Sequence, residues 1–459
     1  MTVLDAPRLR TDAEAVSNIA DWQLYEKALF RFVFLYFGIQ LLPINEQFFK
    51  NLVDTDGGYS RYVFNLSRYA PHFFGPQDTF LNWLVVAIIA LVGAVIWSVR
   101  DQGNANYTRL YYWLRVALRY RLAIGLITYG FIKLFPVQAP LPSISNLNTA
   151  YGDHTAWKLF SLTLGIVPSY QSFLGGVELL GGLLLLHRKT ATLGALIILP
   201  FLGNVFFSNL AYEGGEYVYS GLLLTFALVL FSFDAICLFR LLSLELPAAP
   251  NRFHPILSEW QRYGRLGLKV GFVVFAVVLY GYSTYAVYRN GPVRFPQTPG
   301  LPGVAGLYNV SEFRVDGKTL PYAKNDPIRW QDVVFETWNT ISIKSNQPVA
   351  LLTSNTEELR NTDADRNYEL AGSQGRHYYR YTVDPTRRLL TLKNANPNQA
   401  TETLQLTYTK AGNGRIILVG IDENPAAQHD SIYAVLDKID KKYLVDEAAK
   451  AGRRGALKL

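Results

Sequence analysis

The chain has 459 residues, of which 50% are hydrophobic and 17% are charged, and its formal net charge is +8. Its mean hydropathy of +0.10 is high for a chain with that many charged residues, and its length is enough for two or three domains. The positive charge alone does not indicate nucleic acid, because membrane proteins collect Lys and Arg in their cytoplasmic loops. We expect a lipid bilayer as a partner and no nucleic acid.

Seven mostly apolar segments, each about long enough to cross a bilayer, occur in the first 290 residues. They lie near residues 27 to 43, 80 to 99, 113 to 136, 172 to 187, 190 to 210, 217 to 240 and 267 to 288. The preceding residues, 1–26, are polar and lack the apolar core and cleavage site of a signal peptide. The sequence therefore predicts a cytoplasmic N-terminal segment and an all-α transmembrane bundle of about seven helices over residues 27–290.

Basic residues gather in alternating connections between these segments. The second connection is surrounded by Arg100, Arg109, Arg115, Arg119 and Arg121. The fourth is formed by Arg188 and Lys189, and the sixth is surrounded by Arg240, Arg252, Arg262, Arg265 and Lys269. The positive-inside rule places these connections and the N-terminus in the cytoplasm. With an odd number of spans, the part of the chain after the last span then lies on the opposite side of the membrane, outside the cytoplasm. We expect a multi-pass protein of a bacterial inner (cytoplasmic) membrane with a periplasmic C-terminal domain.

A Pro/Gly-rich stretch, residues 291–303, can continue neither a helix nor a central strand, and predicts a linker with few contacts across it. Asp316-Gly317 and Asn413-Gly414 supply the left-handed residues that tight hairpins need. The sequence predicts an extracytoplasmic antiparallel barrel or sandwich at 304–446 and a basic tail at 447–459. Its predicted strands lie at 308–315, 333–343, 377–383, 389–392, 404–408, 416–419 and 432–436.

The start of this region, Gly306-Leu307-Tyr308, its meander of strands and a final hairpin expected from residue 430 to residue 444 resemble lipocalin-like domains. Tyr308 stands where that family usually has Trp. The resemblance implies a closed antiparallel β-barrel with an apolar cavity for a small ligand. A filled barrel that serves as an interaction platform is the other interpretation.

Two segments carry a more distinctive pattern. The first runs from Arg121 through Gly125 and Tyr129 to Lys133, and the second is Gly175-Gly-Val-Glu178-Leu-Leu-Gly-Gly182, followed by a tight turn. Residues 114–241 resemble the DoxX family of small four-helix membrane proteins. The resemblance implies a membrane-linked redox setting, since founding members are subunits of quinone-coupled oxidases or thiosulfate oxidation systems. Lys133 and Glu178 match the family's pattern, but no catalytic role comes with them.

The candidate site consists of polar residues inside the predicted spans. Glu178 lies about six residues, roughly 9 Å, below the outer end of its span, and an intramembrane ionisable group is a functional hypothesis by default. Gly175 and Gly182 share its helix face, so a neighbouring backbone or a ligand can approach closely. The other candidates are Tyr129 and Lys133 on one segment, Asn204, Ser208 and Tyr212 on another, and Glu213 and Glu216 in the outer loop above them.

Each candidate also has a structural interpretation. Lys133, close to the outer end of its segment, could extend to the lipid headgroups. Glu178 could form an ion pair or hydrogen bond that orients the bundle. Asn204 and Ser208 could form hydrogen bonds between helices.

Few residues are suited to hold a metal or haem. His72 and His154 fall on outer loops, where isolated histidines are usually solvated, and none of the six His lies deep in a predicted span. We expect no metal site and no tightly bound cofactor. Any redox centre would then be carried by a partner or by a quinone.

The preferred functional hypothesis is an auxiliary or quinone-interacting subunit of a membrane redox system, whose outer domain binds a ligand or a membrane or periplasmic protein. The alternatives are a module that binds and transfers a lipophilic small molecule, and an assembly factor without catalysis. Whether the protein is an enzyme stays open at this point.

Overall fold

The computed structural model of the protein describes residues 22–54, 58–75, 78–101, 103, 107–247, 255, 257–291, 296–353, 363, 366–412, 414–422 and 431–446. Most of the predicted N-terminal segment, residues 292–295 of the linker, Asn413 of the second predicted hairpin and the basic tail at 447–459 lie outside these residues.

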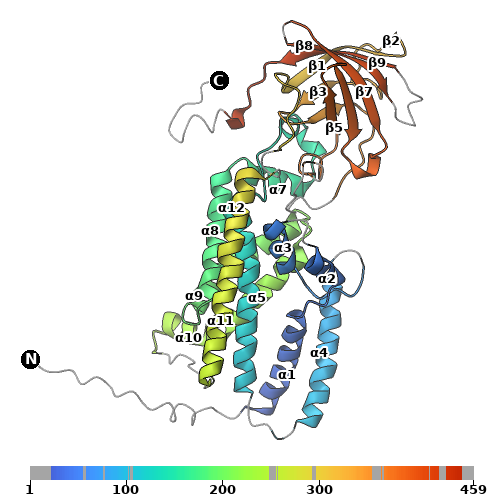
Figure 1. Ribbon diagram of the computed structural model, residues 1–459. Coiled ribbons are helices and arrows are strands. Elements are labelled where there is room, and N and C mark those ends of the chain that lie inside the picture. The colour runs from blue at the N-terminus through green and yellow to red at the C-terminus, as the bar shows by residue number, and fades with distance from the viewer. Residues whose placement is uncertain are drawn as a thin grey trace, which may run out of the picture.

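The chain forms a helical bundle with a β-barrel at one end of it (Figure 1). The helices are α1 (Leu24–Gln40), α2 (Glu46–Val53), α3 (Gly58–Ser67), α4 (Phe80–Arg100), α5 (Thr108–Leu134), α6 (Ile144–Leu147), α7 (Ala156–Gly165), α8 (Pro168–Leu185), α9 (Ala191–Ala211), α10 (Tyr217–Ser243), α11 (Glu259–Val273) and α12 (Tyr280–Asn290). A π-helical segment, Val274–Leu279, joins α11 to α12 without a break.

Four helices in the described part of the chain are long and apolar enough to cross a membrane: α4, α9, α10 and the continuous helix Glu259–Asn290. The predicted number of seven is therefore too high, although each of the seven predicted segments contains a helix. The other three helices fall short for different reasons: α1 has 17 residues, α8 begins with a polar turn, and α5 carries several basic residues.

The basic residues of α5 are explained by its place at the centre of the bundle. It packs against α8, α10 and α3, and most of its residues from Leu118 to Lys133 are buried. Its basic side chains find partners inside the protein: Arg115 forms an ion pair with Asp234, and Arg119 donates to the Leu185 carbonyl oxygen at 2.9 Å. Neighbouring helices surround α5, so its own sequence need not be apolar throughout.

The second part of the chain is a closed antiparallel β-barrel. Its strands are β1 (Gly306–Val315), β3 (Asp332–Phe335), β4 (Thr340–Lys344), β5 (His377–Asp384), β6 (Leu389–Asn394), β7 (Thr403–Lys410), β8 (Arg415–Asp422) and β9 (Ser431–Ile439). Each of these eight strands pairs with the next one, and β9 pairs back to β1. This closed meander agrees with the lipocalin-like expectation, and closure leaves no open sheet edge along its length.

Details of the strand prediction need correction. The segment 333–343 is two strands, β3 and β4, because the chain turns back on itself at residues 336–339, Glu-Thr-Trp-Asn, and the two strands pair antiparallel. The expected final hairpin is instead one strand, β9, which closes the barrel. The turn at Asp316-Gly317 is confirmed: both residues have positive φ, 48° and 74°, and they connect β1 to the two-residue strand β2 (Lys318–Thr319).

The interior of the barrel is a packed core. Every strand of the closed barrel contributes inward-facing buried side chains at alternate positions, as eight-stranded barrels of this size require. Examples are Tyr308 and Val310 on β1, Ile341 and Ile343 on β4, and Leu390 and Leu392 on β6, all 2% exposed or less. This packing corresponds to the filled barrel rather than to one with a large ligand cavity.

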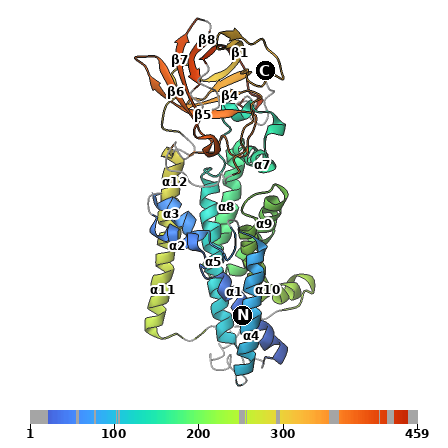
Figure 2. The same ribbon diagram turned by 90° about the vertical axis from the view of Figure 1, so that its right-hand side faces the viewer.

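A polar junction connects the barrel to the bundle, and α6 and α7 lie between the two parts (Figures 1 and 2). Glu336, buried at the base of the barrel, accepts hydrogen bonds from the Ser145 backbone N–H at 2.7 Å and the Ser145 hydroxyl at 2.6 Å. Ser342 donates to the Ser145 hydroxyl at 2.8 Å, and Arg376 donates to Ser342 at 2.9 Å. The expectation of few contacts between the two parts is therefore wrong.

Lys158 of α7 extends this junction. It is 1% exposed, donates a hydrogen bond to the Tyr368 carbonyl oxygen, and its Nζ lies 4.1 Å from the centre of the Tyr368 ring. Burial lowers the pKa of Lys158 from 10.5 to about 7, against the opposing charge of Glu369. Other residues of α7 face the bundle, so this short helix is held between the two parts.

We predict that Lys158→Met removes a pH dependence of stability. Because the folded-state pKa is lowered, the unfolded chain binds more protons between about pH 7 and pH 10.5, and Lys158 makes the folded protein more stable as the pH rises through that window. The slope is at most about 1.4 kcal/mol per pH unit. Thermal unfolding in detergent at pH 7 and pH 9 should show a larger rise for the wild type than for the variant.

The exposed Lys324→Met serves as the control and should keep the wild-type slope. Equal slopes for the wild type and Lys158→Met would show that Lys158 binds its proton equally well in the folded and unfolded states.

Candidate functional site

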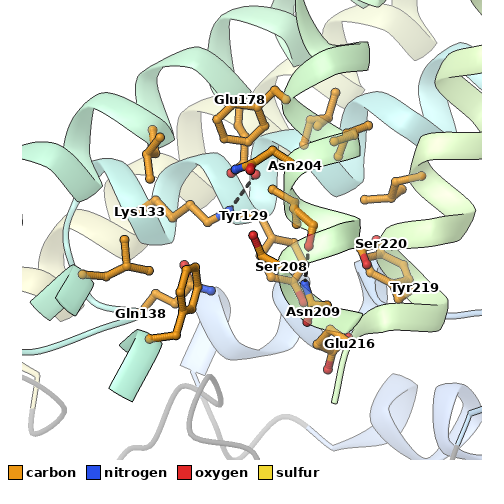
Figure 3. A pocket seen from close by; sticks show the side chains of 18 of the residues that line it. Tyr129, Lys133, Gln138, Glu178, Asn204, Ser208, Asn209, Glu216, Tyr219 and Ser220 are labelled. Atoms are coloured by element: carbon orange, nitrogen blue, oxygen red, sulfur yellow. Dashed lines mark hydrogen bonds and ion pairs between the residues drawn. The ribbon is translucent and has the colours of Figure 1, made fainter. Parts of the chain in front are cut away.

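A cavity of about 100 Å³, measured as the space open to the centre of a water molecule, lies among α5, α8, α9 and α10. Trp157, Phe160, Ser161 and Leu164 of α7 also line it. A cavity of this size holds several water molecules or part of a small ring compound, since a cavity of about 150 Å³ is known to bind benzene. Figure 3 shows the polar side chains that line it.

Lys133 and Glu178 form a buried ion pair at this cavity. The Lys133 Nζ donates to Glu178 Oε1 at 2.6 Å, and the two residues are 8% and 2% exposed (Figure 3). The second carboxylate oxygen, Glu178 Oε2, is buried and accepts no hydrogen bond from the residues that the structure describes. A buried carboxylate oxygen without a donor is costly, so this atom is suited to receive a hydrogen bond from a ligand.

Glycines bring α5 and α8 close enough for this pair to form. A Cβ atom on Gly175 would lie 2.2 Å from the Leu134 nitrogen, and one on Gly130 would lie 2.9 Å from the Leu179 nitrogen. One on Gly182 would lie 2.9 Å from a side-chain carbon of Ile127. The predicted close approach of a neighbouring helix at Gly175 and Gly182 is confirmed.

The cavity brings most of the predicted site residues together. Tyr129, Lys133, Glu178, Asn204, Ser208 and Glu216 all line it. Tyr129 also packs beside the ion pair, with its ring centre 5.6 Å from the Lys133 Nζ. Tyr129 and Lys133, four residues apart on α5, therefore meet Asn204 and Ser208, four residues apart on α9, at the cavity.

Two predicted residues lie elsewhere. Tyr212 caps the C-terminus of α9 and stacks on Phe160, with ring centres 4.8 Å apart. Glu213 is exposed and has a positive φ of 57°, so it forms part of the turn rather than of the cavity wall. Neither is among the residues that line the cavity.

Sequence reasoning missed other lining residues: Gln138, Trp157, Ser161, Asn209, Tyr219 and Ser220. Trp157 and Ser161 have the four-residue spacing of one helix face, but nothing in the sequence indicated that the short helix α7 would cover a cavity of the helical bundle. Asn209 packs against the turn after α9, where a Cβ on Gly214 would lie 2.5 Å from Asn209 Oδ1. This oxygen is buried and has no hydrogen-bond partner among the described residues.

The cavity extends from Glu216, in the loop before α10, to the surface of α9. Glu216 forms an ion pair with Arg68, which ties the loop before α10 to the segment after α3. Asn204 lines the cavity and is exposed on α9, one of the helices long and apolar enough to cross a membrane. The cavity therefore reaches the side of the bundle at Asn204.

The two loop histidines have nearby hydrogen-bond partners. His72 lies 2.9 Å from Asp78 Oδ1 and 2.7 Å from the Gly75 carbonyl oxygen, and His154 lies 2.8 Å from the Ser373 hydroxyl. The described residues contain no group of three or more His, Cys, Asp or Glu arranged to hold a metal ion.

We predict that Lys133 and Glu178 are energetically coupled. Removing one partner by Lys133→Met or Glu178→Gln leaves the other buried without its counter-charge, and loss of one partner of a buried pair typically costs about 3–5 kcal/mol. The double variant should therefore be more stable than the sum of the single changes implies. Unfolding in detergent measures the cycle, with the exposed Glu213→Gln as the control, and additive single effects would contradict the coupling.

Comparisons with known proteins give limited information. No family model matches the chain. No solved structure matches it either. A stretch of 115 residues, 25% of this chain, is 31% identical to the "Uncharacterized protein YwoB" of Bacillus subtilis (strain 168), and it covers 71% of that protein. Through this stretch, the chain belongs to the same family as YwoB.

Proposed function

We propose that the helical part binds a lipophilic molecule with a polar head, a quinone, and that the protein is an auxiliary subunit of a membrane redox system. The observation that carries the proposal is the buried Lys133–Glu178 pair, whose free carboxylate oxygen lies at an otherwise largely apolar cavity. The DoxX resemblance of residues 114–241 motivates the choice of a quinone.

The chemistry of the cavity suits such a head group. Apolar side chains, among them Leu126, Leu174 and Phe201, surround space for a ring. Quinone carbonyl oxygens accept hydrogen bonds, which the Lys133 ammonium and the Ser208 hydroxyl are able to donate. A quinol hydroxyl is a donor, and Glu178 Oε2 is an acceptor without a partner among the described residues. Both redox forms would therefore find suitable groups.

The position of the cavity favours entry from the lipid. Asn204 is exposed on α9, so a ligand dissolved in the membrane would reach the cavity from the side of the bundle. Ligand pockets between the helices of a bundle are common, and a polar amide at this point would guide the head group past the apolar surface of α9.

In the proposed arrangement, the barrel lies in the periplasm of a bacterial inner-membrane protein whose N-terminus is cytoplasmic. The course of the chain supports this orientation: α5 and α12 run toward the barrel, so the basic connections before α5, after α8 and before α11 lie at helix ends directed away from it (Figure 1). The packed barrel interior favours a surface that binds a membrane or periplasmic protein, as in the assembly-factor alternative, over a carrier of lipophilic molecules.

We predict that a quinone quenches the fluorescence of Trp157, because this residue lines the cavity. Titration of the purified protein with a short-chain quinone should give saturable quenching, most of which disappears in Trp157→Phe. Glu178→Gln should weaken binding about tenfold, the equivalent of about 1.4 kcal/mol. Ser208→Phe, which fills the cavity without changing a charge, should abolish binding.

Glu213→Gln, an exposed change close to the site in sequence, should bind as the wild type does. Quenching that persists at full strength in Ser208→Phe would place the quinone outside this cavity.

The proposed orientation leads to a separate prediction. A reporter enzyme that is active only in the periplasm should work when it is fused after Gly303, and a reporter that is active only in the cytoplasm should not. The opposite result would place the barrel in the cytoplasm and overturn the proposed orientation.

A further inference from the structure

Arg121 is a buried cation next to the cavity and hydrogen-bonded to Tyr219, one of the residues that line it. It lies midway along α5, 13 residues from Thr108 and 13 from Leu134, or about 20 Å from either end. It is 5% exposed, and Gly125, one helical turn further along, lines the cavity. A Cβ on Gly125 would lie 2.9 Å from the Tyr219 hydroxyl oxygen, so Gly125 and Tyr219 are in direct contact.

The partners of Arg121 are neutral. Its Nη2 donates to the Tyr69 carbonyl oxygen at 2.6 Å, and its Nη1 donates to the Tyr219 hydroxyl at 3.4 Å. The guanidinium carbon lies 4.0 Å from the centre of the Tyr69 ring and 5.6 Å from that of the Tyr219 ring. Among the residues that the structure describes, its buried Nε has no hydrogen-bond partner and no carboxylate forms an ion pair with it.

The charges around the cavity therefore do not cancel. Lys133 pairs with Glu178, and Arg68 pairs with Glu216, whereas Arg121 has no counter-charge among the described residues. In a site largely shielded from water, an uncompensated positive charge creates a strong local potential that favours an anion. Tyr219 lines the cavity and is hydrogen-bonded to Arg121, so this potential acts at the cavity itself.

We propose that the cavity selects a head group that carries a negative charge, and that Arg121 determines this selectivity. The inference rests on the proposed function and specifies its ligand: a lipophilic molecule whose head is ionised, such as a hydroxyquinone anion. Arg121 acts through Tyr219 and supplies positive charge at that side of the site, while Lys133 is the donor that contacts the ionised head group directly. The Tyr219 hydroxyl donates its own proton to the Ser67 carbonyl oxygen at 2.9 Å, which keeps its oxygen directed toward Arg121.

The test uses two naphthoquinones with the same alkyl chain, one with a ring hydroxyl that is ionised at neutral pH and one with hydrogen at that position. The full-length protein in detergent should bind the ionised compound at least tenfold more tightly. Arg121→Met should reduce this preference to about threefold or less, and Arg121→Lys, which keeps the charge, should retain most of it. In the wild type, the preference should also disappear at a pH low enough to protonate the ring hydroxyl.

Arg119→Met is the matched control. Arg119 is also buried on α5, but its Nε donates to the carbonyl oxygen of Leu185, which, unlike Tyr219, is not among the residues that line the cavity. This variant should keep the tenfold preference. The pH comparison is made on the wild type and needs no variant to fold.

The outcomes separate the two proposals. If neither compound binds, the proposed function fails. If both compounds bind the wild type equally well, the cavity binds quinones but has no preference for an anion, and the inference is overturned. A preference that survives in Arg121→Met would overturn the role of Arg121.

Discussion

The close contact between α5 and α8 is the constraint on which the candidate site depends. Where Gly130 and Gly175 face each other there is no room for a Cβ atom, so the two backbones approach until Lys133 and Glu178 meet at 2.6 Å. Larger residues would push the helices apart and leave two buried charges without partners, at a cost in stability that few membrane proteins could sustain. The glycines are therefore part of the site although they make no polar contact with it.

The short helix α7 connects this site to the barrel. Trp157 and several other side chains of α7 line the cavity. Lys158, also on α7, is buried against Tyr368, in the loop between β4 and β5. The barrel is also fixed through Ser145 and Glu336, so the segment between α5 and α8 belongs structurally to both parts. A change in the position of the barrel would be transmitted to the outer end of the cavity through this one segment.

Sequence patterns indicated the local features well and the tertiary ones poorly. Four-residue spacing placed Tyr129 and Lys133 on one face of a helix, and the alternation of apolar residues predicted most strands of the barrel. Arg121, in contrast, was counted with the basic residues that surround a cytoplasmic connection. In the structure it is buried at the centre of α5, where neighbouring helices shield it from water. Hydropathy also counted too many spans, since it does not distinguish a helix that contacts lipid from one surrounded by protein. Trp157 and Tyr219 were missed because their approach to the cavity depends on how separate helices pack.

The closure of the barrel by its last strand determines when its edges are protected. Neighbouring strands in the meander are also neighbours along the chain, except that β1 pairs with β9, so that Leu307 lies opposite Ile439. One edge of β1 therefore stays unpaired from the time it is made until the final strand has been synthesised and has paired with it. A chain cut short before β9 would keep every other strand pair and yet present two open edges, at β1 and β8, to other molecules. Such a product would be prone to edge-to-edge association while most of its sheet is intact.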